Sequence, residues 1–533
     1  MSKKVMLQMM VFCLTAISLF ATGQDEEQAG SGSSIYQVRE GCEEPLEISM
    51  GWWGIDTFLV ENDQLREKIE GEFNIKIKGQ NFTWSDWQEK CRLWAVSGEL
   101  PDVFANSIVN TPDYFKWIDQ GIIEPLPRDL SEYPNIDRVM KIEEIKALTQ
   151  PDGNRYIIPR IKQYEDDQTT MARGMFVRKD WMEKLNFENP GSFEEFYAMT
   201  RAFVEDDPDG NGMDDTVGIT THNKHYLPTL FLSTCPNALN DSWVKRDGQW
   251  IPSWTTPEFN EGLTQVHKLF HDGILDPDMA ILKGMEGREK FASGKVGVYL
   301  AQTTPGNAKQ LKLSWEKYND TPFEDSIGIL HVWPSKDGVQ YRHTEKSFWS
   351  STYFRGGLEE EKMERILMLY DYLLSEEGVK LLTYGIEGED YVQDGDQITL
   401  TWEKDADGNT IDLLNKYKSL GIFQGMPSWY EFTWYEDNPI NRLNFTEEAL
   451  KMSLDSFNWK MENAEAIPTN YLIDLMVTPA KTKIVFNSDS LIRVVLSPED
   501  PILGWEKVID DFRAKGLNQA IYEVNEKAQL LGY

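Results

Sequence analysis

The residues with the clearest chemical pattern form an acidic loop, Asp207-Pro-Asp-Gly-Asn-Gly-Met-Asp-Asp215. Oxygen-bearing side chains stand at positions 1, 3, 5 and 9 of this loop, and a glycine stands at position 6. In an EF-hand-type calcium loop, alternate side chains and one backbone carbonyl point inward, and the glycine permits the sharp turn. Position 12 is Gly218, which offers no carboxylate. The alternative is a turn that needs no metal, because Pro, Asp, Gly and Asn all favour turns.

Catalytic motifs are absent from the sequence. It contains no GxSxG, no HExxH and no P-loop. Two histidine pairs, His222/His225 and His267/His271, have helix-compatible spacing for a metal, but such pairs more often lie on a helix surface, and we read them so. The paired carboxylates of a glycosidase cannot be recognised, since 88 acidic residues would always supply a pair. The run Asp405-Ala-Asp-Gly-Asn409 is read as a turn.

A second set of candidates is aromatic. Sugar recognition needs flat aromatic faces against C–H surfaces, together with polar groups for the hydroxyls. Trp52 and Trp53 end a predicted strand, and loops at the carboxyl ends of strands line the crevice of an α/β sheet. Core packing is the alternative for each of the 18 Trp, and we assign Trp94 and Trp181 to the core. The remaining candidates lie before a helix, at a strand end or in irregular loops: Trp84, Asp86, Asn106, Trp349, Tyr391 and Trp429.

The elements that must position these residues alternate between strand and helix. A helix at 87–96 stops at a glycine and leads into a strand at 100–106, which predicts an α/β unit with a parallel sheet. An apolar stripe and a capping box at Ser192 predict the helix before the acidic loop. Further strands are predicted at 46–54, 74–78, 296–300, 327–332 and 398–402, and further helices at 63–70, 259–271, 359–374 and, interrupted near Gly516, 505–531.

Length and charge limit the classes of protein to which this chain can belong. At 533 residues the chain is long enough for more than one domain. Its 88 acidic and 53 basic residues give a formal net charge of −35. Such a chain does not bind nucleic acid non-specifically, because phosphate neutralisation needs basic patches. The acidity also argues against an anionic ligand, unless the binding site is locally basic.

The N-terminus has the features of a secretory signal peptide. Lys3 and Lys4 precede an uncharged apolar run at 5–20, and small residues follow at 21–23, so we expect cleavage before Gln24. The protein would then be periplasmic or secreted. Cys13 lies inside the apolar run, which disfavours a lipid anchor and leaves one possible. The other three cysteines allow at most one disulfide, and Cys91 is predicted to be a buried thiol.

Five segments together resemble the extracellular solute-binding proteins of ABC-type sugar importers. The resemblance is to family 1, and within it to the large oligosaccharide-binding subgroup that includes alginate-binding proteins. The segments occur in the family's order and spacing from residue 95 to residue 391: AVSGELPDV at 95–103, GIIEPL at 121–126, VRKDWMEKL at 177–185 with the acidic loop, ASGKVG at 292–297 and YGIEGEDY at 384–391.

The resemblance implies an α/β, two-domain periplasmic-binding-protein (Venus-flytrap) fold with several interdomain crossings. A signal peptide (1–23) and a flexible tether (24–44) would precede an N-terminal domain of 45–165 and 340–385 and a C-terminal domain of 166–339 and 386–533. It also implies a structural calcium ion, held by the side chains of Asp207, Asp209, Asn211 and Asp215 and the carbonyl of Met213. The family commonly has Glu at the next position, where this chain has Thr216.

The function expected from the sequence is that of a monomeric, non-enzymatic binding component. It would capture an oligosaccharide between two closing domains and deliver it to the transmembrane subunits of an ABC permease. Two alternatives stay open. One is a secreted carbohydrate-active enzyme, either a glycosidase or a lyase. The other is a binder of peptide or polyamine on the same fold, which the acidic chain would suit.

Overall fold

The computed structural model describes residues 44–162, 172–235, 242–395, 397–404, 411–427, 445–467 and 470–533. The predicted signal peptide, nearly all of the predicted tether, Cys42, Trp429 and the predicted turn at 405–409 lie outside these residues. Within the described chain, no helix is both long enough and apolar enough to cross a bilayer.

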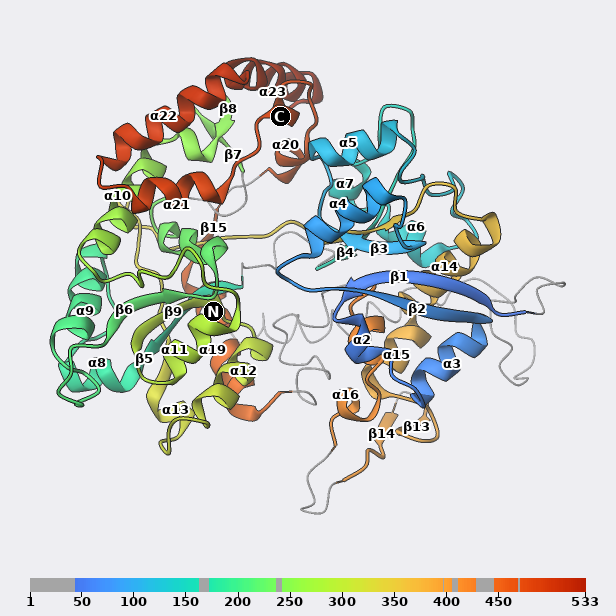
Figure 1. Ribbon diagram of the computed structural model, residues 1–533, viewed down its shortest axis with the longest axis horizontal. Coiled ribbons are helices and arrows are strands. Elements are labelled where there is room, and N and C mark those ends of the chain that lie inside the picture. The colour runs from blue at the N-terminus through green and yellow to red at the C-terminus, as the bar shows by residue number, and fades with distance from the viewer. Residues whose placement is uncertain are drawn as a thin grey trace. The chain divides into compact units, whose positions relative to one another are not determined.

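A five-stranded sheet forms the first of two large sheets, with the order β2-β1-β3-β12-β4 (Figure 1). Strands β1, β2 and β3 run parallel, as the sequence predicts, while β12 runs antiparallel to both β3 and β4. Most of β1 is buried on both faces, which is typical of a sheet covered on both sides. The strands are β1 (Leu46–Trp53), β2 (Ile75–Phe82), β3 (Val103–Asn106), β4 (Ile158–Ile161) and β12 (Phe348–Phe354).

Helices contact this sheet directly. Both α2 and α3 contact β2, α4 contacts β3, and α6 contacts β4 and α14. The predicted helix at 87–96 is α4, and it ends at Gly98 in the left-handed conformation, where a residue without Cβ is favoured. The helices are α2 (Ile55–Phe58), α3 (Gln64–Glu72), α4 (Trp87–Ser97), α5 (Pro112–Asp119), α6 (Pro134–Val139), α7 (Glu143–Lys146), α14 (Glu360–Leu373) and α15 (Glu376–Tyr384).

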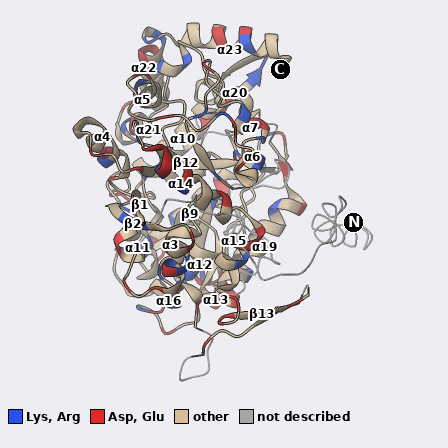
Figure 2. Cartoon of the chain, turned by 90° about the vertical axis from the view of Figure 1, so that its right-hand side faces the viewer, with Lys and Arg blue, Asp and Glu red and all other residues tan. Residues whose placement is uncertain are grey.

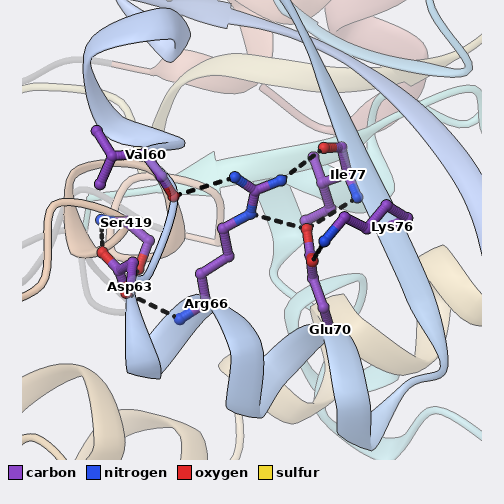
Figure 3. A network of polar contacts seen from close by, with 7 residues as sticks. All are labelled: Val60, Asp63, Arg66, Glu70, Lys76, Ile77 and Ser419. Atoms are coloured by element: carbon purple, nitrogen blue, oxygen red, sulfur yellow. Dashed lines mark hydrogen bonds and ion pairs between the residues drawn. The ribbon is translucent and has the colours of Figure 1, made fainter.

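A network of polar contacts fixes α3 against β2 (Figure 3). Arg66 donates to the Glu70 carboxylate over 2.8 Å and to the Ile77 carbonyl over 3.0 Å. The Glu70 carboxylate accepts in turn from the Ile77 amide at 3.0 Å. Asp63 caps the start of α3 by accepting from the Arg66 amide at 2.9 Å. Its carboxylate also accepts two hydrogen bonds from Ser419, one from the amide and one from the hydroxyl, each at 2.8 Å.

Described residues that follow α15, among them Ser419, Gln424 and Gly425, contact the start of α3, α15 and β4. Besides the Ser419–Asp63 bonds, Gln424 donates to the Leu382 carbonyl over 2.7 Å, and the Gly425 carbonyl accepts from Arg160 of β4 over 2.6 Å. The sequence-based domain boundary assigns this segment to the C-terminal domain. Its elements are β13 (Tyr391–Asp394), β14 (Gln397–Leu400), α16 (Leu413–Lys416) and α17 (Leu420–Phe423).

A four-stranded sheet has the order β10-β5-β9-β6. The inner strand β9 pairs parallel with β6 and antiparallel with β5, and β10 pairs antiparallel with β5. Helices α9 and α11 contact both β6 and β9. The elements are β5 (Arg173–Arg178), β6 (Val217–Thr221), β9 (Val296–Gln302), β10 (Ile327–Ile329), α8 (Lys179–Leu185), α9 (Phe193–Glu205), α10 (Pro257–His271), α11 (Met285–Ala292), α12 (Pro305–Trp315), α13 (Phe323–Ser326) and α19 (Glu447–Asn463).

The C-terminal helices pack on α10 and share one apolar core with the second sheet. Trp181, Trp254 and Trp505 lie in this core, so the assignment of Trp181 to the core is confirmed. The chain breaks between two helices at Gly516, as predicted. The remaining elements are α20 (Tyr471–Leu475), α21 (Ser488–Leu496), α22 (Pro501–Ala514), α23 (Leu517–Leu531), η2 (Lys224–Phe231), η3 (Ser253–Thr255), η5 (Lys481–Lys483), β7 (Trp243–Arg246), β8 (Gln249–Pro252), β11 (Tyr341–Arg342) and β15 (Glu465–Ala466).

Both cysteines of the described chain are free and buried, namely Cys91 and Cys235. Burial raises the pKa of each thiol to about 12. The prediction of a buried thiol at Cys91 is therefore confirmed.

Candidate ligand-binding site

Four tryptophans gather at the carboxyl edge of the first sheet. Trp53 ends β1, and Trp84 follows β2; their rings stack at a centroid distance of 4.7 Å and an angle of 17°. Trp349 of β12 stacks on Trp84 at 6.0 Å, and Trp87 at the start of α4 lies 5.4 Å from Trp53. We call Trp53, Trp84, Trp87 and Trp349 the tryptophan cluster. Trp84 is its most accessible member, with 61% of its surface exposed.

The direction of β12 brings Trp349 to this edge. Because β12 is antiparallel to β3, its amino end lies beside the carboxyl end of β3, where Ser351 pairs with Asn106. The pairing of β12 with β4 shifts between Phe348 and Ser351, and Ser350 has φ 58°. Such bulges re-aim side chains at sheet edges. The irregularity therefore sets the direction of Trp349.

A buried arginine lies against the tryptophans at the end of β1. The Arg160 guanidinium carbon is 4.6 Å from the Trp52 ring centroid and 5.3 Å from that of Trp53. Arg160 also donates to the Ser350 hydroxyl over 3.0 Å and to the Gly425 carbonyl. Trp52 itself is 3% exposed, so it backs the cluster from the core side. Sequence reasoning missed Arg160, although an arginine inside the apolar strand Ile158–Ile161 is a usable signal.

The two polar candidates near the cluster have local roles. Asp86 accepts from the Thr83 amide at 2.6 Å and from the Thr83 hydroxyl at 2.8 Å, which closes the turn that carries Trp84. Asn106 is buried, and its side-chain oxygen accepts from the Ser107 amide at 2.8 Å. Its side-chain nitrogen has no hydrogen-bond partner among the described residues.

The structure does not bring Tyr391 to the tryptophan cluster. Tyr391 lies in β13, is 5% exposed, and its ring contacts Tyr384 at a centroid distance of 5.7 Å. Trp429 falls outside the described residues. Of the eight predicted ligand residues, Trp52, Trp53, Trp84, Asp86, Asn106 and Trp349 therefore share one sheet edge.

The carboxyl edge of the second sheet carries a polar group of residues. His222 directly follows β6, and its Nδ1 lies 2.8 Å from the hydroxyl of Tyr299 in β9. Burial and the nearby Arg288 lower the pKa of His222 to about 4, so this imidazole is neutral at pH 7. Arg173, at the start of β5, pairs with the end of β9 and lies 4.6 Å over the Tyr226 ring. The sequence analysis did not select these residues as ligand contacts.

Neither histidine pair is arranged around a metal. His225 Nδ1 lies 3.0 Å from the Ser488 hydroxyl, whereas His222 binds Tyr299. His267 and His271 both direct Nε2 at the Ser497 carbonyl over 2.9 Å. That carbonyl sits at the end of α21, where helix carbonyls lack intrahelical partners. The imidazoles therefore have partners within the protein. His222 directly follows strand β6 and does not lie on a helix surface, which corrects the sequence-based reading for that residue.

The acidic loop folds so that its oxygen-bearing side chains converge on Asn211. The Asn211 side-chain nitrogen donates to Asp209 over 2.8 Å and to Asp215 over 3.2 Å. Asp207 accepts from the amides of Asn211 and Gly212 at 3.1 Å each. Among the described residues, no group of three or more His, Cys, Asp or Glu is placed to hold a metal.

The position after the loop cannot supply a ligand. The Thr216 hydroxyl donates to the Phe203 carbonyl of α9 over 2.8 Å, so it is directed at the helix. The oxygen donors fit calcium chemistry in type, but a bidentate carboxylate is missing from the set.

The two sheets carry different side chains at their carboxyl edges: tryptophans at the first, and His222, Tyr299 and Arg173 at the second. The family model described as "Bacterial extracellular solute-binding protein" matches residues 60–353. The chain belongs to this family, and it is a non-enzymatic solute-binding component.

Known relatives agree with this assignment. The "Polygalacturonan/rhamnogalacturonan-binding protein YtcQ" of Bacillus subtilis is 24% identical over 398 residues, which cover 73% of this chain and 74% of the relative. The crystal structure of the alginate-binding protein AlgQ2 without calcium ion superposes with a TM-score of 0.68 at 17% identity, covering 91% of this chain and 98% of that one. The Streptococcus pneumoniae substrate-binding protein FusA in complex with kestose gives 0.67 at 18% identity, covering 92% and 99%. The two-sheet binding-protein fold expected from the sequence is thereby confirmed.

Proposed function

We propose that this protein is the substrate-binding component of an ABC importer for oligosaccharides, and that the tryptophan cluster is part of its ligand site. The observation that carries the proposal is the stack of Trp53, Trp84 and Trp349 at the carboxyl edge of a parallel sheet, with Trp84 exposed. Ligands of open α/β sheets bind outside the carboxyl ends of the strands. Flat aromatic faces suit the C–H surfaces of sugars. The names of the relatives, a polygalacturonan/rhamnogalacturonan-binding protein and a substrate-binding protein in complex with kestose, support a glycan ligand.

The mode of binding is proposed as closure of two domains over the ligand, followed by delivery to membrane permease subunits. The domain boundaries predicted from the sequence stay a proposal, with one revision. The contacts of Ser419, Gln424 and Gly425 with elements of the first sheet support extending the N-terminal domain's last segment from 385 to 426. The signal peptide, a periplasmic or secreted location and a monomeric state likewise remain proposals.

Binding without turnover tests the proposal. The mature protein would be melted in the presence of neutral oligosaccharides, acidic oligosaccharides, peptides and polyamines, since a ligand that binds the folded state raises the melting temperature by mass action. At least one glycan class is expected to raise it, and each incubated glycan is expected to be recovered intact. If only peptides or polyamines raise the melting temperature, the proposal of an oligosaccharide ligand is wrong.

We also propose a structural calcium ion in the acidic loop. Asp207, Asp209, Asn211 and Asp215 would supply side-chain oxygens and Met213 its carbonyl; a bound ion would neutralise the carboxylates and tie the end of α9 to the start of β6. The convergence of these side chains on Asn211 supports the proposal. Melting the ligand-free protein with and without a chelator tests it: calcium should restore stability lost to the chelator, and an unchanged melt would remove calcium from this loop.

A further inference from the structure

Arg288 is a buried arginine whose guanidinium is not fully satisfied by hydrogen bonds within the described residues. It lies in α11 and is 8% exposed, and its Nε is buried without any hydrogen-bond partner among the described residues. The other buried arginines among the described residues all have polar partners. Arg160 donates to Gly425 and Ser350, Arg178 pairs with Asp180, and Arg365 pairs with Glu361.

Close packing holds Arg288 at the carboxyl edge of the second sheet. The neighbouring Gly287 leaves no room between α11 and β6, because a Cβ there would lie 2.2 Å from the Thr221 carbonyl oxygen. Thr221 is the last residue of β6, so the first turn of α11 lies at the edge where His222 begins. Arg288 is close enough to His222 to contribute to the lowering of its pKa. The amino end of α11, which carries the positive end of the helix dipole, lies at the same edge.

This edge carries more than one arginine. Arg173 lies at the same edge, since it pairs with Gln302 at the end of β9. The carboxylate of Glu286, in the first turn of α11, accepts from the Lys283 amide at 3.0 Å. Figure 2 shows Lys and Arg positions interspersed with Asp and Glu positions along the chain. A buried cation whose Nε has no hydrogen-bond partner among the described residues departs from that pattern, in a chain of net charge −35.

A buried charge is costly unless it is paired, and the described residues leave the Arg288 Nε without a hydrogen-bond partner. A ligand that arrives from outside would supply one. A carboxylate fits best in geometry, because a guanidinium fork binds its two oxygens with two parallel hydrogen bonds. Neutral His222 offers no competing charge, and its Nε2 is left for a sugar oxygen once Nδ1 has bound Tyr299.

We propose that Arg288 binds the carboxylate of an acidic sugar, so that the preferred ligand of this protein contains uronate residues. The proposal rests on the oligosaccharide-binding function proposed above and narrows its substrate class. It also supplies the local positive charge without which so acidic a protein would repel an acidic glycan.

The test compares ligands that differ only in their carboxylates. Oligogalacturonates and oligomers of alginate uronates would be titrated by calorimetry beside their carboxyl-reduced, neutral counterparts. The unmodified protein is expected to bind an acidic oligomer with at least tenfold higher affinity than the neutral counterpart. In Arg288→Gln this preference should fall to within about threefold, while affinity for the neutral counterpart changes little. Arg288→Lys keeps the charge without the fork and should retain part of the preference.

Arg513→Gln is the matched control, because it removes one positive charge from the exposed surface of α22. It should leave the preference unchanged. The ligand-free melting temperature of Arg288→Gln should equal or exceed that of the unmodified protein, since no hydrogen bond of the Arg288 Nε within the described residues is lost.

The outcomes separate the two proposals. Three outcomes would overturn the role of Arg288 and leave oligosaccharide binding standing. They are equal affinity for acidic and neutral oligomers, a preference that survives Arg288→Gln, and a clear drop in the melting temperature of that variant. Failure of every glycan to bind would instead refute the proposed function itself.

Discussion

Among single residues, Trp84 is the one whose substitution we expect to weaken ligand binding while leaving stability nearly unchanged. Its ring stacks on Trp53 and is 61% exposed, so its removal costs little buried apolar area. Aromatic contacts of this kind contribute on the order of 1–3 kcal/mol to binding. We expect Trp84→Ala to weaken oligosaccharide binding about tenfold to a hundredfold, with the unfolding free energy within about 1 kcal/mol of the unmodified value.

Tyr522→Ala is the control for Trp84→Ala, because Tyr522 is an aromatic of similar exposure, 56%, on α23. It should leave binding unchanged. Calorimetric titration and urea unfolding of both variants check the prediction, and loss of stability without loss of affinity in Trp84→Ala would contradict it.

The candidate-site residues that the sequence predicts differ from those that it misses in whether a local sequence pattern indicates them. Trp52 and Trp53 could be placed because they end an apolar run, and strand ends in α/β sheets face the ligand crevice. Trp349 could be selected but not located, since its place depends on an antiparallel pairing between β12 and β3. Arg288 carries no local signal, because the missing hydrogen-bond partner of its Nε among the described residues is a property of its three-dimensional surroundings.

Among the elements, α3 shows how one side chain joins distant segments. Asp63 caps α3 locally and accepts two hydrogen bonds from Ser419, far along the chain. We expect Asp63→Ala to lower the unfolding free energy by about 3 kcal/mol: about 1 for the cap and the rest for the buried donors of Ser419. Asp500→Ala should cost only about 1 kcal/mol, because Asp500 caps α22 through exposed local bonds. Urea unfolding checks both, and equal losses would mean that the Ser419 bonds contribute nothing.

The contact between α11 and β6 gives a second prediction for an element. Gly287→Ala would place a Cβ 2.2 Å from the Thr221 carbonyl oxygen, so α11 must move away from the sheet. We expect a loss of about 1–3 kcal/mol, and a weaker preference for acidic oligomers because Arg288 moves with the helix. Gly71→Ala in α3 meets nothing within 4 Å and should instead stabilise by up to about 1 kcal/mol. Thermal melting and titration of the two variants check this, and a fully stable Gly287→Ala would refute the close contact.

Strands and helices with a clear period were predictable, while the distant partners of a segment were not. The glycine stop of α4 and the apolar strand β9 follow from local sequence. The segment 386–426 has no local mark of its neighbours, and the sequence-based boundary placed it with the second domain. Its packing rests on side-chain bonds to Asp63 and Leu382, which no periodicity encodes.

Across the whole molecule, buried histidines link stability to pH. Burial lowers the pKa of both His222 and His343 from 6.5 to about 4. The folded state therefore keeps these groups neutral where the unfolded chain binds protons, so stability is full above pH 6.5 and falls as the pH drops toward 4. A shift of this size is worth about 3 kcal/mol for each histidine at the low end of that range. Carboxylates with a lowered pKa, such as those of Glu258 and Asp272, add their losses mainly below pH 4.

We therefore expect the melting temperature to fall by several degrees between pH 7 and pH 4.5, before carboxylate protonation dominates. His343 is 4% exposed, and its Nε2 lies 2.6 Å from the Leu232 carbonyl. His343→Gln keeps a donor for that carbonyl but cannot titrate, so it should lose about half of the pH dependence while costing stability at pH 7. Melting both proteins at half-unit steps of pH measures this difference. An unchanged pH profile in His343→Gln would mean that His343 is not held neutral by the fold. The acid sensitivity would then have to come from the other histidines with a lowered pKa, which are His222, His225 and His331, and from the carboxylates.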